Sequence, residues 1–494
     1  MPFLIENATL VIFALFVLAL LGNIFLIGIV FLRRHRRGKF FRRIDAMRTR
    51  YGPVVVGLLS GSIAYAQGLQ ELREICCPDR MFILEQLCLG KKPLPAEEPI
   101  LRRLCEDLGL VKVWQQRLMG QIDQASLREA LMNPQGLLRR VKLLHFLIRS
   151  KSAENLGLIR HEASWPLLVK ALEDPNPDLQ VVAVRALAAI QHPGSFPALV
   201  EQLHKAVVGA APVLSVRTIK SALVNFPLQC AQELQPTLLH ANPRIRFFAT
   251  DIIREMVERE AEANPDFCLD SKRMNDSMAE TFLTRLSRDT NPDVRARAAP
   301  VIAYLPDRRA ATTLFALLED PAWFVRLHAA RSLAKPRFFS YAARISRALT
   351  DADWRVRETA VRTLRTFGPA GLDVLTEHFL LTEDRYSLEQ IADEFQRAGL
   401  VPDLLARCVQ NGGGRDAELL RHLAEMGKTS YMIAVVENGK GNGDLRKKFL
   451  QQFGRCPDPQ IHQWVKKVAA GEPDLSVRAL AQKALDGVQP AGER

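Results

Sequence analysis

Apolar residues in the middle of the chain recur with a period of 31 residues. The segment "EDPAWFVRLHAARSLA" (319–334) aligns with "TDADWRVRETAVRTLR" (350–365). In each copy three apolar positions are spaced four and four, which places them on one face of a helix. A turn rich in Asp, Asn and Pro stands before that helix, and an apolar position six residues before the turn belongs to an earlier helix. The pattern therefore predicts a repeating pair of helices.

Three copies of the repeat share one frame. Five and six residues after the acidic residue of the turn comes a Val-Arg pair, nine residues after it an Ala, and thirteen after it an Ile or Leu. We expect Val and Leu to fill the layers between helices, and Ala to let neighbouring helices approach closely. The structural positions predicted from this frame are Asp289, Val294, Arg295, Ala298, Asp320, Val325, Arg326, Ala329, Asp351, Val356, Arg357 and Ala360.

The same frame fits other segments. Asp174 is the turn residue of one of them, Arg246, Arg446 and Arg478 occupy the arginine position of three others, and Arg217 fits that position more loosely. A helix pair of this length cannot bury its apolar face alone, so successive pairs must cover one another. The predicted fold class is all-α: an α-solenoid of stacked helical hairpins that follows one N-terminal transmembrane helix.

The Asp-Pro turn, the Val-Arg pair and the following Ala and Leu resemble HEAT-type repeats, including the short bacterial variety. The resemblance covers 168–368 and returns at 444–488, whereas 258–277 reads as an inserted polar loop. It implies that the repeated arginines bond to carboxylates or carbonyls between neighbouring pairs; a polar ladder facing a ligand is the alternative. Trp323 and Trp354 match in register, and we expect them to be partly buried beside the turn, with peptide docking as the alternative.

The expected organisation follows from these segments. In order along the chain we predict a short extracytoplasmic tail (1–7), a transmembrane helix (8–32), a basic juxtamembrane segment (33–51), a helical N-terminal cap or degenerate repeats (52–150), HEAT-like repeats (151–368), degenerate helical repeats with Gly-rich loops (369–443), C-terminal repeats (444–488) and a tail (489–494).

The N-terminal stretch 8–32 holds 25 residues without a charge. As a helix it would measure about 37 Å, enough to cross a hydrocarbon layer of ~30 Å. The positive-inside rule places the basic residues that follow, and the bulk of the chain, in the cytoplasm, with the N-terminus outside. A cleaved signal peptide fits less well, because the stretch is too long and lacks a basic n-region and a small-residue cleavage site.

Residues 33–50 carry nine Lys/Arg and one acid, a net charge of +8 out of the chain's +13. The run serves as a topology signal, and it can also bind anionic lipid headgroups. Candidate headgroup contacts are Arg33, Arg34, Arg36, Arg37, Lys39, Arg42 and Arg43. The second uncharged stretch, 52–69, contains glycines, serines and a Gln, and we expect a soluble helix or hairpin there.

Candidate chemistry is sparse. The eight cysteines form no CxxC pair, no histidine pair has metal-ligand spacing, and the Gly-rich segments 411–416 and 437–444 lack the P-loop lysine. We therefore expect no enzyme, no catalytic or metal site and no cofactor. The leading hypothesis is a single-pass scaffold at the inner (cytoplasmic) membrane that binds a membrane-associated protein partner, with no nucleic acid and no evident small-molecule substrate. The alternatives are an enzyme similar to the phycobilin lyases and a nucleic-acid-binding HEAT-like protein.

Overall fold

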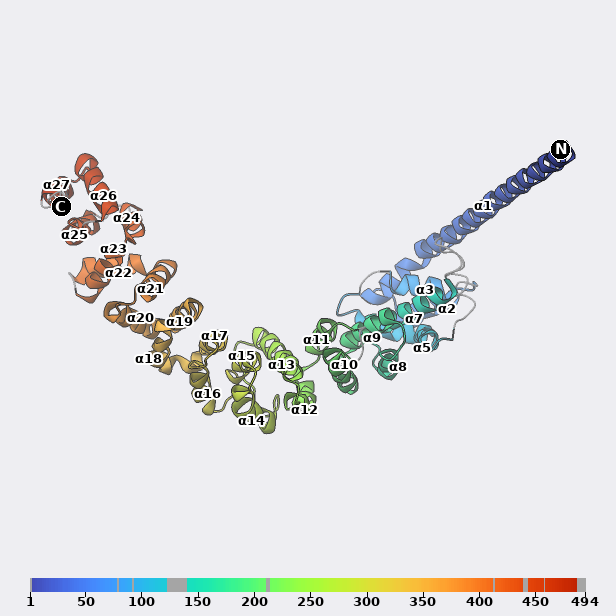
Figure 1. The fold of residues 1–494 in the computed structure, drawn as a ribbon, viewed down its shortest axis with the longest axis horizontal. Helices are drawn as coiled ribbons and strands as arrows, with labels where there is room; N and C mark the ends of the chain where they lie inside the picture. The colour runs from blue at the N-terminus through green and yellow to red at the C-terminus, as the bar shows by residue number, and fades with distance from the viewer. Residues whose placement is uncertain are drawn as a thin grey trace. The chain divides into compact units, whose positions relative to one another are not determined.

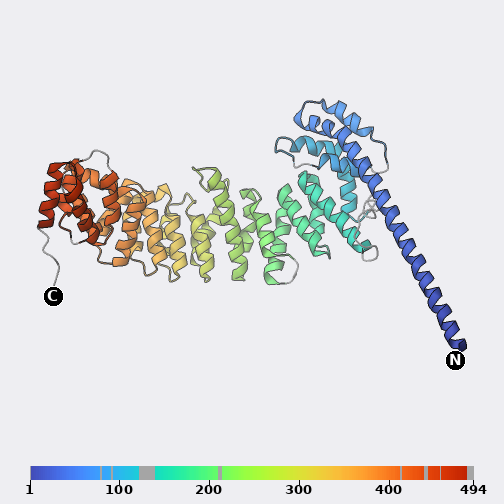
Figure 2. The ribbon, with the colours of Figure 1, turned by 90° about the horizontal axis from the view of Figure 1, so that it is seen from above.

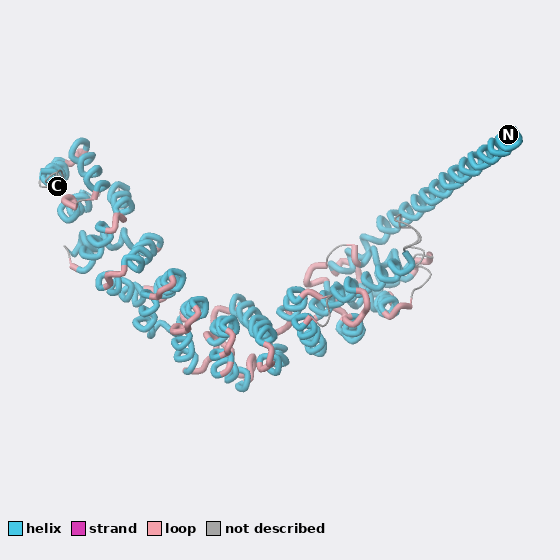
Figure 3. The backbone as a smooth tube through the Cα atoms, viewed as in Figure 1, coloured by secondary structure: helices cyan, strands magenta, loops and turns pink. Residues whose placement is uncertain are grey.

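A computed structural model describes residues 2–77, 80–90, 93–121, 140–209, 214–411, 414–438, 443–456 and 458–486. Over these residues the chain consists of helices joined by turns and loops (Figure 3). It divides into two compact units, Met1–Leu234 and Gln235–Arg494. The predicted tail, 489–494, lies outside the described residues. The predicted all-α fold is confirmed.

Unit 1 begins with one very long helix, which is followed by short helices and then by helical hairpins (Figure 1). Its helices are α1 (Pro2–Ser60), α2 (Tyr65–Arg73), α3 (Arg80–Cys88), α4 (Glu98–Asp107), α5 (Leu110–Leu118), α7 (Arg140–Leu158), η1 (Glu162–Ser164), α8 (Trp165–Ala171), α9 (Pro177–Ile190), η2 (Pro193–Ser195), α10 (Phe196–Val208), α11 (Val216–Val224) and η3 (Leu228–Leu234).

Unit 2 consists of successive helix pairs that lie side by side (Figures 1 and 2). Its helices are α12 (Gln235–Leu238), α13 (Pro243–Ala263), α14 (Asp276–Thr284), η4 (Leu286–Arg288), α15 (Pro292–Ile302), α16 (Arg309–Leu317), α17 (Trp323–Ser332), η5 (Pro336–Tyr341), α18 (Ala342–Ile345), η6 (Ser346–Thr350), α19 (Trp354–Thr366), α20 (Pro369–Leu381), α21 (Arg385–Arg397), α22 (Leu400–Asn411), α23 (Arg415–Glu425), α24 (Thr429–Asn438), α25 (Gly443–Phe453), α26 (Pro459–Gly471) and α27 (Leu475–Asp486).

Helix α1 joins the apolar stretch to the core of unit 1 without a break. Its side chains from Ile12 to Leu32 are exposed, with a mean hydropathy of 2.8, so the helix is long and apolar enough to cross a membrane. Farther along the same helix Val55 and Leu58 are buried, and the Phe40 ring lies 5.7 Å from that of Phe82 in α3. The boundaries predicted within 2–51 therefore all fall inside one continuous helix.

The second uncharged stretch, 52–69, forms the end of α1, a short turn and the start of α2. Val55, Leu58 and Gly68 are buried, and a Cβ atom at Gly68 would lie 2.6 Å from Leu58. The two helices are thus packed tightly against each other, which is the hairpin arrangement expected for this stretch.

The second helix of each pair supplies the apolar layers of the repeats. In α15 Val294, Ala298 and Ile302 are fully buried, and the equivalent residues of α17 and α19 are fully buried as well. These second helices contact one another in sequence order, α13 to α15 to α17 to α19 to α21 in unit 2 and α7 to α9 to α11 in unit 1. The Ala positions of the frame, Ala298, Ala329 and Ala360, are fully buried within this stack.

Local hydrogen bonds from backbone amides close the repeat turns, two of them before α15 and α19; the turn before α17 has only the first, from the Ala322 amide to Asp320 at 2.9 Å, because Ala322 has no capping side chain. At the turn before α15 the Asp289 carboxylate accepts from the Asn291 amide at 2.8 Å, and Asn291 then caps the helix by accepting from the Asp293 amide at 2.7 Å. Asp351 and Asp353 repeat this pair of contacts before α19. Asp, Asn and Pro recur in these turns because a capping side chain and a proline at the first helical position favour helix initiation.

The inserted loop is shorter than the sequence suggested. Helix α13 runs on to Ala263 and α14 begins at Asp276, so only residues 264–275 connect the two helices. Met256 and Val257 are buried, so the long helix keeps packing beyond its repeat positions, although its last turns are polar. The reading of 258–277 as a loop was wrong for residues 258–263 and 276–277.

Candidate binding surface of the repeat helices

The repeated arginines form a ladder of ion pairs between neighbouring helix pairs of unit 2. The Arg295 guanidinium donates to both carboxylate oxygens of Asp320, from Nε at 2.6 Å and from Nη2 at 2.8 Å. Arg326 donates to Asp351 in the same way, at 2.7 Å from each nitrogen, and Arg246 to Asp289 likewise. We call each such arginine–carboxylate pair a rung. A rung joins one repeat to the turn of the next through bidentate, charge-assisted hydrogen bonds.

Each ladder arginine also ties down its own turn. Nη1 of Arg295 donates to the Asp289 carbonyl at 2.7 Å, and Nη1 of Arg326 donates to the Asp320 carbonyl at 2.8 Å. The hydrogen bonds to Asp320 raise the pKa of Arg295, and those to Asp351 raise the pKa of Arg326. The arginines are thus held as cations, partnered by the carboxylates and carbonyls that the family resemblance implied.

Similar pairs occur at other points of the chain. In unit 1 Arg149 lies 2.6 Å from the Asp174 carboxylate. The arginine position of the repeat that begins at Asp174 is occupied by Gln180, whose side chain donates to the Asp174 carbonyl at 2.7 Å. Near the C-terminal end Arg446 donates to both oxygens of Glu472 at 2.9 and 3.0 Å, so Glu replaces Asp in that rung.

The ladder is interrupted at Arg357. Its Nη1 donates to the Asp351 carbonyl at 2.6 Å, as in the other repeats. The residue 25 positions on, where the other rungs have Asp, is Thr382. Arg357 is only 8% exposed, and its Nε has no hydrogen-bond partner among the described residues. The Tyr386 ring lies 5.7 Å from its guanidinium carbon. This arginine therefore has the position of a ladder residue and lacks the carboxylate.

The two matched tryptophans differ in their surroundings. The Arg355 guanidinium lies 3.4 Å from the centre of the Trp323 ring and covers it, a cation–π contact. Trp354 is 55% exposed, so the expectation that it is partly buried was wrong. The physical reason is in the next repeat: the residue 32 positions after Trp323 is Arg355, whereas the one 32 positions after Trp354 is Tyr386.

The basic residues after the apolar stretch lie on helix α1. Side chains of Arg34, Lys39, Arg42 and Arg43 are exposed. Arg42 donates from Nε to the Gly38 carbonyl one turn earlier at 3.3 Å. The side chains of Arg33, Arg36 and Arg37 lie outside the described residues. The helix therefore presents at least four cations within about three turns of the end of the apolar stretch.

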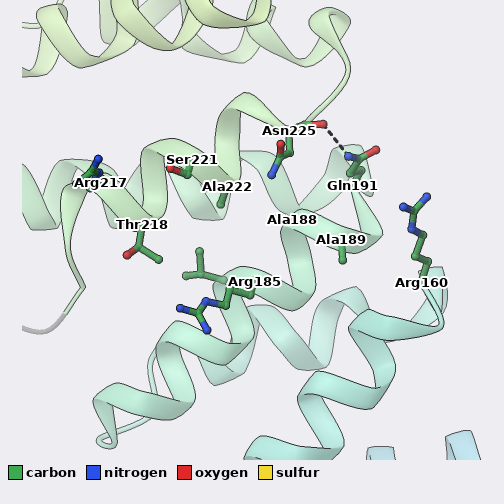
Figure 4. Close-up of a pocket in the computed structure, with 11 residues that line it drawn as sticks. Arg160, Arg185, Ala188, Ala189, Gln191, Arg217, Thr218, Ser221, Ala222 and Asn225 are labelled. Atoms are coloured by element: carbon green, nitrogen blue, oxygen red, sulfur yellow. Dashed lines mark hydrogen bonds between the residues drawn. The ribbon is translucent and has the colours of Figure 1, made fainter. Parts of the chain in front are cut away.

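A cavity of about 630 Å³ opens on the second helices of unit 1, between the end of α7, α9 and α11 (Figure 4). Three arginines line it, one from the turn after α7, one from α9 and one from α11, together with two hydroxyl and two amide side chains. The lining residues used below are Arg160, Arg185, Gln191, Arg217, Thr218, Ser221 and Asn225, over a floor of Ala188, Ala189 and Ala222. Among the described residues, the lining contains no carboxylate and no aromatic ring.

Two residues of the cavity have an unusual backbone. Arg160 has φ of 49° and Gln191 has φ of 58°, and they are the non-glycine residues with positive φ in the described part of the chain. This left-handed conformation costs an L-residue roughly 1–2 kcal/mol. At other helix ends the position is occupied by glycine, as at Gly109 and Gly209. The Gln191 side chain uses this placement to donate to the Asn225 carbonyl at 2.7 Å.

Reasoning from sequence did not find this cavity. Arg185 and Arg217 stand 32 residues apart, but they occupy different positions of the repeat frame, and Arg160 lies at the end of a helix whose register was unclear. The signal that could have revealed it is the arginine at a helix end where glycine is usual. Among the described residues no group of three or more His, Cys, Asp or Glu side chains is arranged to hold a metal ion.

The sequence profile of HEAT repeats matches residues 137–211 and 279–338. No curated protein matches the chain. Among solved structures, the chain is similar to an engineered protein from a structural genomics consortium (18% identity, 76% of this chain and 98% of that chain, TM-score 0.33). It is also similar to human deoxyhypusine hydroxylase in complex with glycerol (15%, 57% and 95%, TM-score 0.22). A third is a microtubule polymerase structure with an array of tumor-overexpressed-gene domains (12%, 69% and 90%, TM-score 0.25).

The matched segments fall in both units, and the Val-Arg frame, the capped turns and the rungs extend the same repeat beyond them. The chain therefore carries HEAT repeats in an all-α, HEAT-like solenoid that follows an N-terminal apolar helix.

Proposed function

We propose that this protein is a membrane-anchored scaffold whose repeat helices bind a protein partner at the cytoplasmic face of the membrane. The observation that carries the proposal is the continuity of α1, which holds an apolar, fully exposed stretch at one end and buried core residues, Val55 and Leu58, at the other. A tether of this kind raises the effective concentration of the repeat surface toward any partner in the same membrane.

The apolar helix by itself suits either an anchor or a signal sequence. Two features favour the anchor. Helix α1 continues through the basic run to Ser60 without an extended segment in which a signal peptidase could cut, and the exposed cations after Leu32 match the positive-inside pattern. In this orientation Arg34, Lys39, Arg42 and Arg43 are close enough to the bilayer surface to contact anionic headgroups.

The proposed role is binding and not catalysis. HEAT-like solenoids stack their second helices into a surface suited to binding. In unit 2 these helices carry arginines and exposed aromatic rings, and in unit 1 they line the cavity. The partner we propose is a membrane-associated protein.

The test is extraction of membranes with alkaline carbonate from cells that produce the full chain, followed by sequencing of the N-terminus of the product. The proposal expects the intact chain in the membrane pellet and release into the supernatant when residues 8–32 are deleted. A chain that begins after residue 32, or that is released by carbonate with its apolar helix intact, would contradict the anchor. A matched control replaces Gly52 with Ala, a site with free space around it in the same helix.

A further inference from the structure

The cavity between α7, α9 and α11 concentrates positive charge that its own lining does not neutralise. We infer that it binds an acidic segment of the protein partner, with side-chain carboxylates against Arg160, Arg185 and Arg217. The inference rests on the proposed scaffold function and names the chemistry of the partner. Four features of the cavity support this inference: its charge balance, the spacing of its cations, the strained backbone at its rim and the lack of aromatic rings among its described lining residues.

The charge balance distinguishes this cavity from the rest of the repeats. Arg185 and Arg217 are exposed and make no ion pair with any described residue. Arg160 lies 3.4 Å from Glu98, in a pair whose side chains remain 50% and 21% exposed. The ladder arginines, in contrast, are each paired with a largely buried carboxylate, as in Arg326 with Asp351. The cavity arginines form at most a weak, exposed ion pair within the chain, so they are available to bind an external anion.

The spacing of the cations favours an extended segment over a single small ion. Figure 4 shows the three guanidinium groups at separate points around the cavity; Arg160 lies in the turn after α7, Arg185 on α9 and Arg217 on α11. Packed helices lie about 8–10 Å apart. In an extended peptide, residues two and three positions apart are separated by roughly 7–10 Å. Side chains on alternate residues of an extended chain point to the same face, so carboxylates on alternate residues of an acidic segment would reach successive arginines.

The remaining groups of the lining suit a peptide backbone and carboxylates. Thr218 and Ser221 bring hydroxyl groups from α11, and Asn225 brings a side-chain amide. The Gln191 amide nitrogen is already bonded to the Asn225 carbonyl, so its side-chain oxygen can accept from a peptide N–H. The alanine floor of Ala188, Ala189 and Ala222 leaves room for a chain to lie against the helices.

The strained backbone at the rim points to binding and not to stability. Glycine could adopt the positive φ of residues 160 and 191 at no steric cost, yet the chain has Arg and Gln there, and both side chains line the cavity. Strained residues of this kind are characteristic of ligand-binding sites. The lining has no aromatic ring on which bases could stack, which argues against a single-stranded nucleic acid as the occupant.

The first experiment measures binding to the full chain in phosphatidylcholine nanodiscs, which contain no anionic lipid to occupy the juxtamembrane run. The probe is a fluorescent hexaglutamate peptide, and hexaglutamine is the neutral comparison. The cavity variant is a double mutant that carries Arg185→Gln and Arg217→Gln. The matched control is Arg347→Gln with Arg385→Gln, which removes the same charge at exposed positions of unit 2.

We expect the cavity variant to weaken hexaglutamate binding by about tenfold or more, and the control by less than about threefold. Equal weakening by the two variants would overturn the inference, because it would assign the binding to net charge. Displacement of the peptide by inorganic phosphate at equal concentration would overturn it in favour of a small anion. Tighter binding of a dT oligonucleotide, lost in the cavity variant, would overturn it in favour of nucleic acid.

A further variant, Arg160→Gly, separates folding from binding. Glycine relieves the backbone strain, so the melting temperature should be retained while hexaglutamate affinity falls; retained affinity in this variant would contradict the role of Arg160. In cells, partners that co-purify with the wild-type chain should be lost from the cavity variant. Partners kept by that variant would contradict this inference alone, whereas a wild-type chain without membrane partners would contradict the scaffold function as well.

Discussion

The interruption of the ladder at Thr382 offers a direct test of how the repeats hold together. Replacing Thr382 with Asp should create the missing rung with Arg357. The Thr382 hydroxyl already accepts from the Asp384 amide at 3.3 Å, the contact that the Asp351 carboxylate makes with the Asp353 amide at 2.8 Å. An aspartate at 382 would therefore begin in the turn geometry of the other rungs.

The magnitude follows from the state of Arg357. Its guanidinium is 8% exposed with Nε unpaired, so most of its desolvation cost is present in the natural chain. A hydrogen bond to a charged group contributes about 1.5–3 kcal/mol. Desolvation of the new carboxylate, and its repulsion from Asp384, which caps α21, reduce this gain. We expect a net stabilisation of about 1–3 kcal/mol.

The assay is amide hydrogen exchange of α19 and α21 in the full chain, held in detergent micelles, because a repeat array opens locally and a single melting point would average over it. A stabilisation of about 1–3 kcal/mol slows exchange roughly fivefold to 150-fold. Thr382→Asn is the matched control, since asparagine keeps the turn contact and adds no charge. Equal protection in the Asp and Asn variants would refute the reasoning, because it would mean that Arg357 is not positioned as a ladder residue.

Three further predictions follow from the packing and the charges. Asp320→Asn should destabilise the α15–α17 layer by about 3–5 kcal/mol, because it leaves the Arg295 cation without its carboxylate; unchanged amide exchange in both helices would contradict this. Gly157→Ala should destabilise unit 1 by about 1–3 kcal/mol, because the new Cβ would lie 2.7 Å from the Ala186 backbone, whereas Gly52→Ala, with open space, should not; unchanged amide exchange in α7 and α9 of the Gly157 variant would contradict this. Burial and the nearby Arg297, Arg331 and Arg254 lower the pKa of His328 to about 4, with Asp251 opposing them. The unfolded chain therefore binds the proton first, and stability should fall as the pH drops from about 6.5 toward 4, by at most about 1.4 kcal/mol per pH unit. A His328→Gln variant should flatten this dependence in pH-dependent urea denaturation, and an unchanged slope would contradict the assignment.

Sequence periodicity was sufficient to predict the repeat helices. Val294, Ala298 and Ile302 are spaced four and four, and that spacing alone places them on one face, which in the structure is fully buried. The turns could be predicted as well, because Asp, Asn and Pro act through local hydrogen bonds that depend on near neighbours. The end of α13 could not be predicted from the sequence. Its last turns are polar, and the helix continues into them from Met256 and Val257, whose burial only the structure reveals.

The cavity could not be predicted for a different reason. Its three arginines come from three elements and from unrelated positions of the repeat frame, so no spacing in the sequence brings them together. The exposure of Trp354 likewise depends on a residue of the following repeat, Tyr386, which stands where an arginine covers Trp323. Properties set by one helix were predictable, whereas those set by contacts between repeats required the structure.

The most direct test of the account is site-specific photocrosslinking in intact cells. A photoreactive amino acid at Ser221, in the cavity, is compared with one at Arg347, on an exposed surface of unit 2. The account predicts that Ser221 crosslinks to a membrane-fraction protein, that the crosslinked peptide maps to an Asp/Glu-rich segment, and that deletion of residues 8–32 abolishes the product. Crosslinks that are identical at both positions, that map to segments without acidic residues, or that persist without the apolar helix would contradict it.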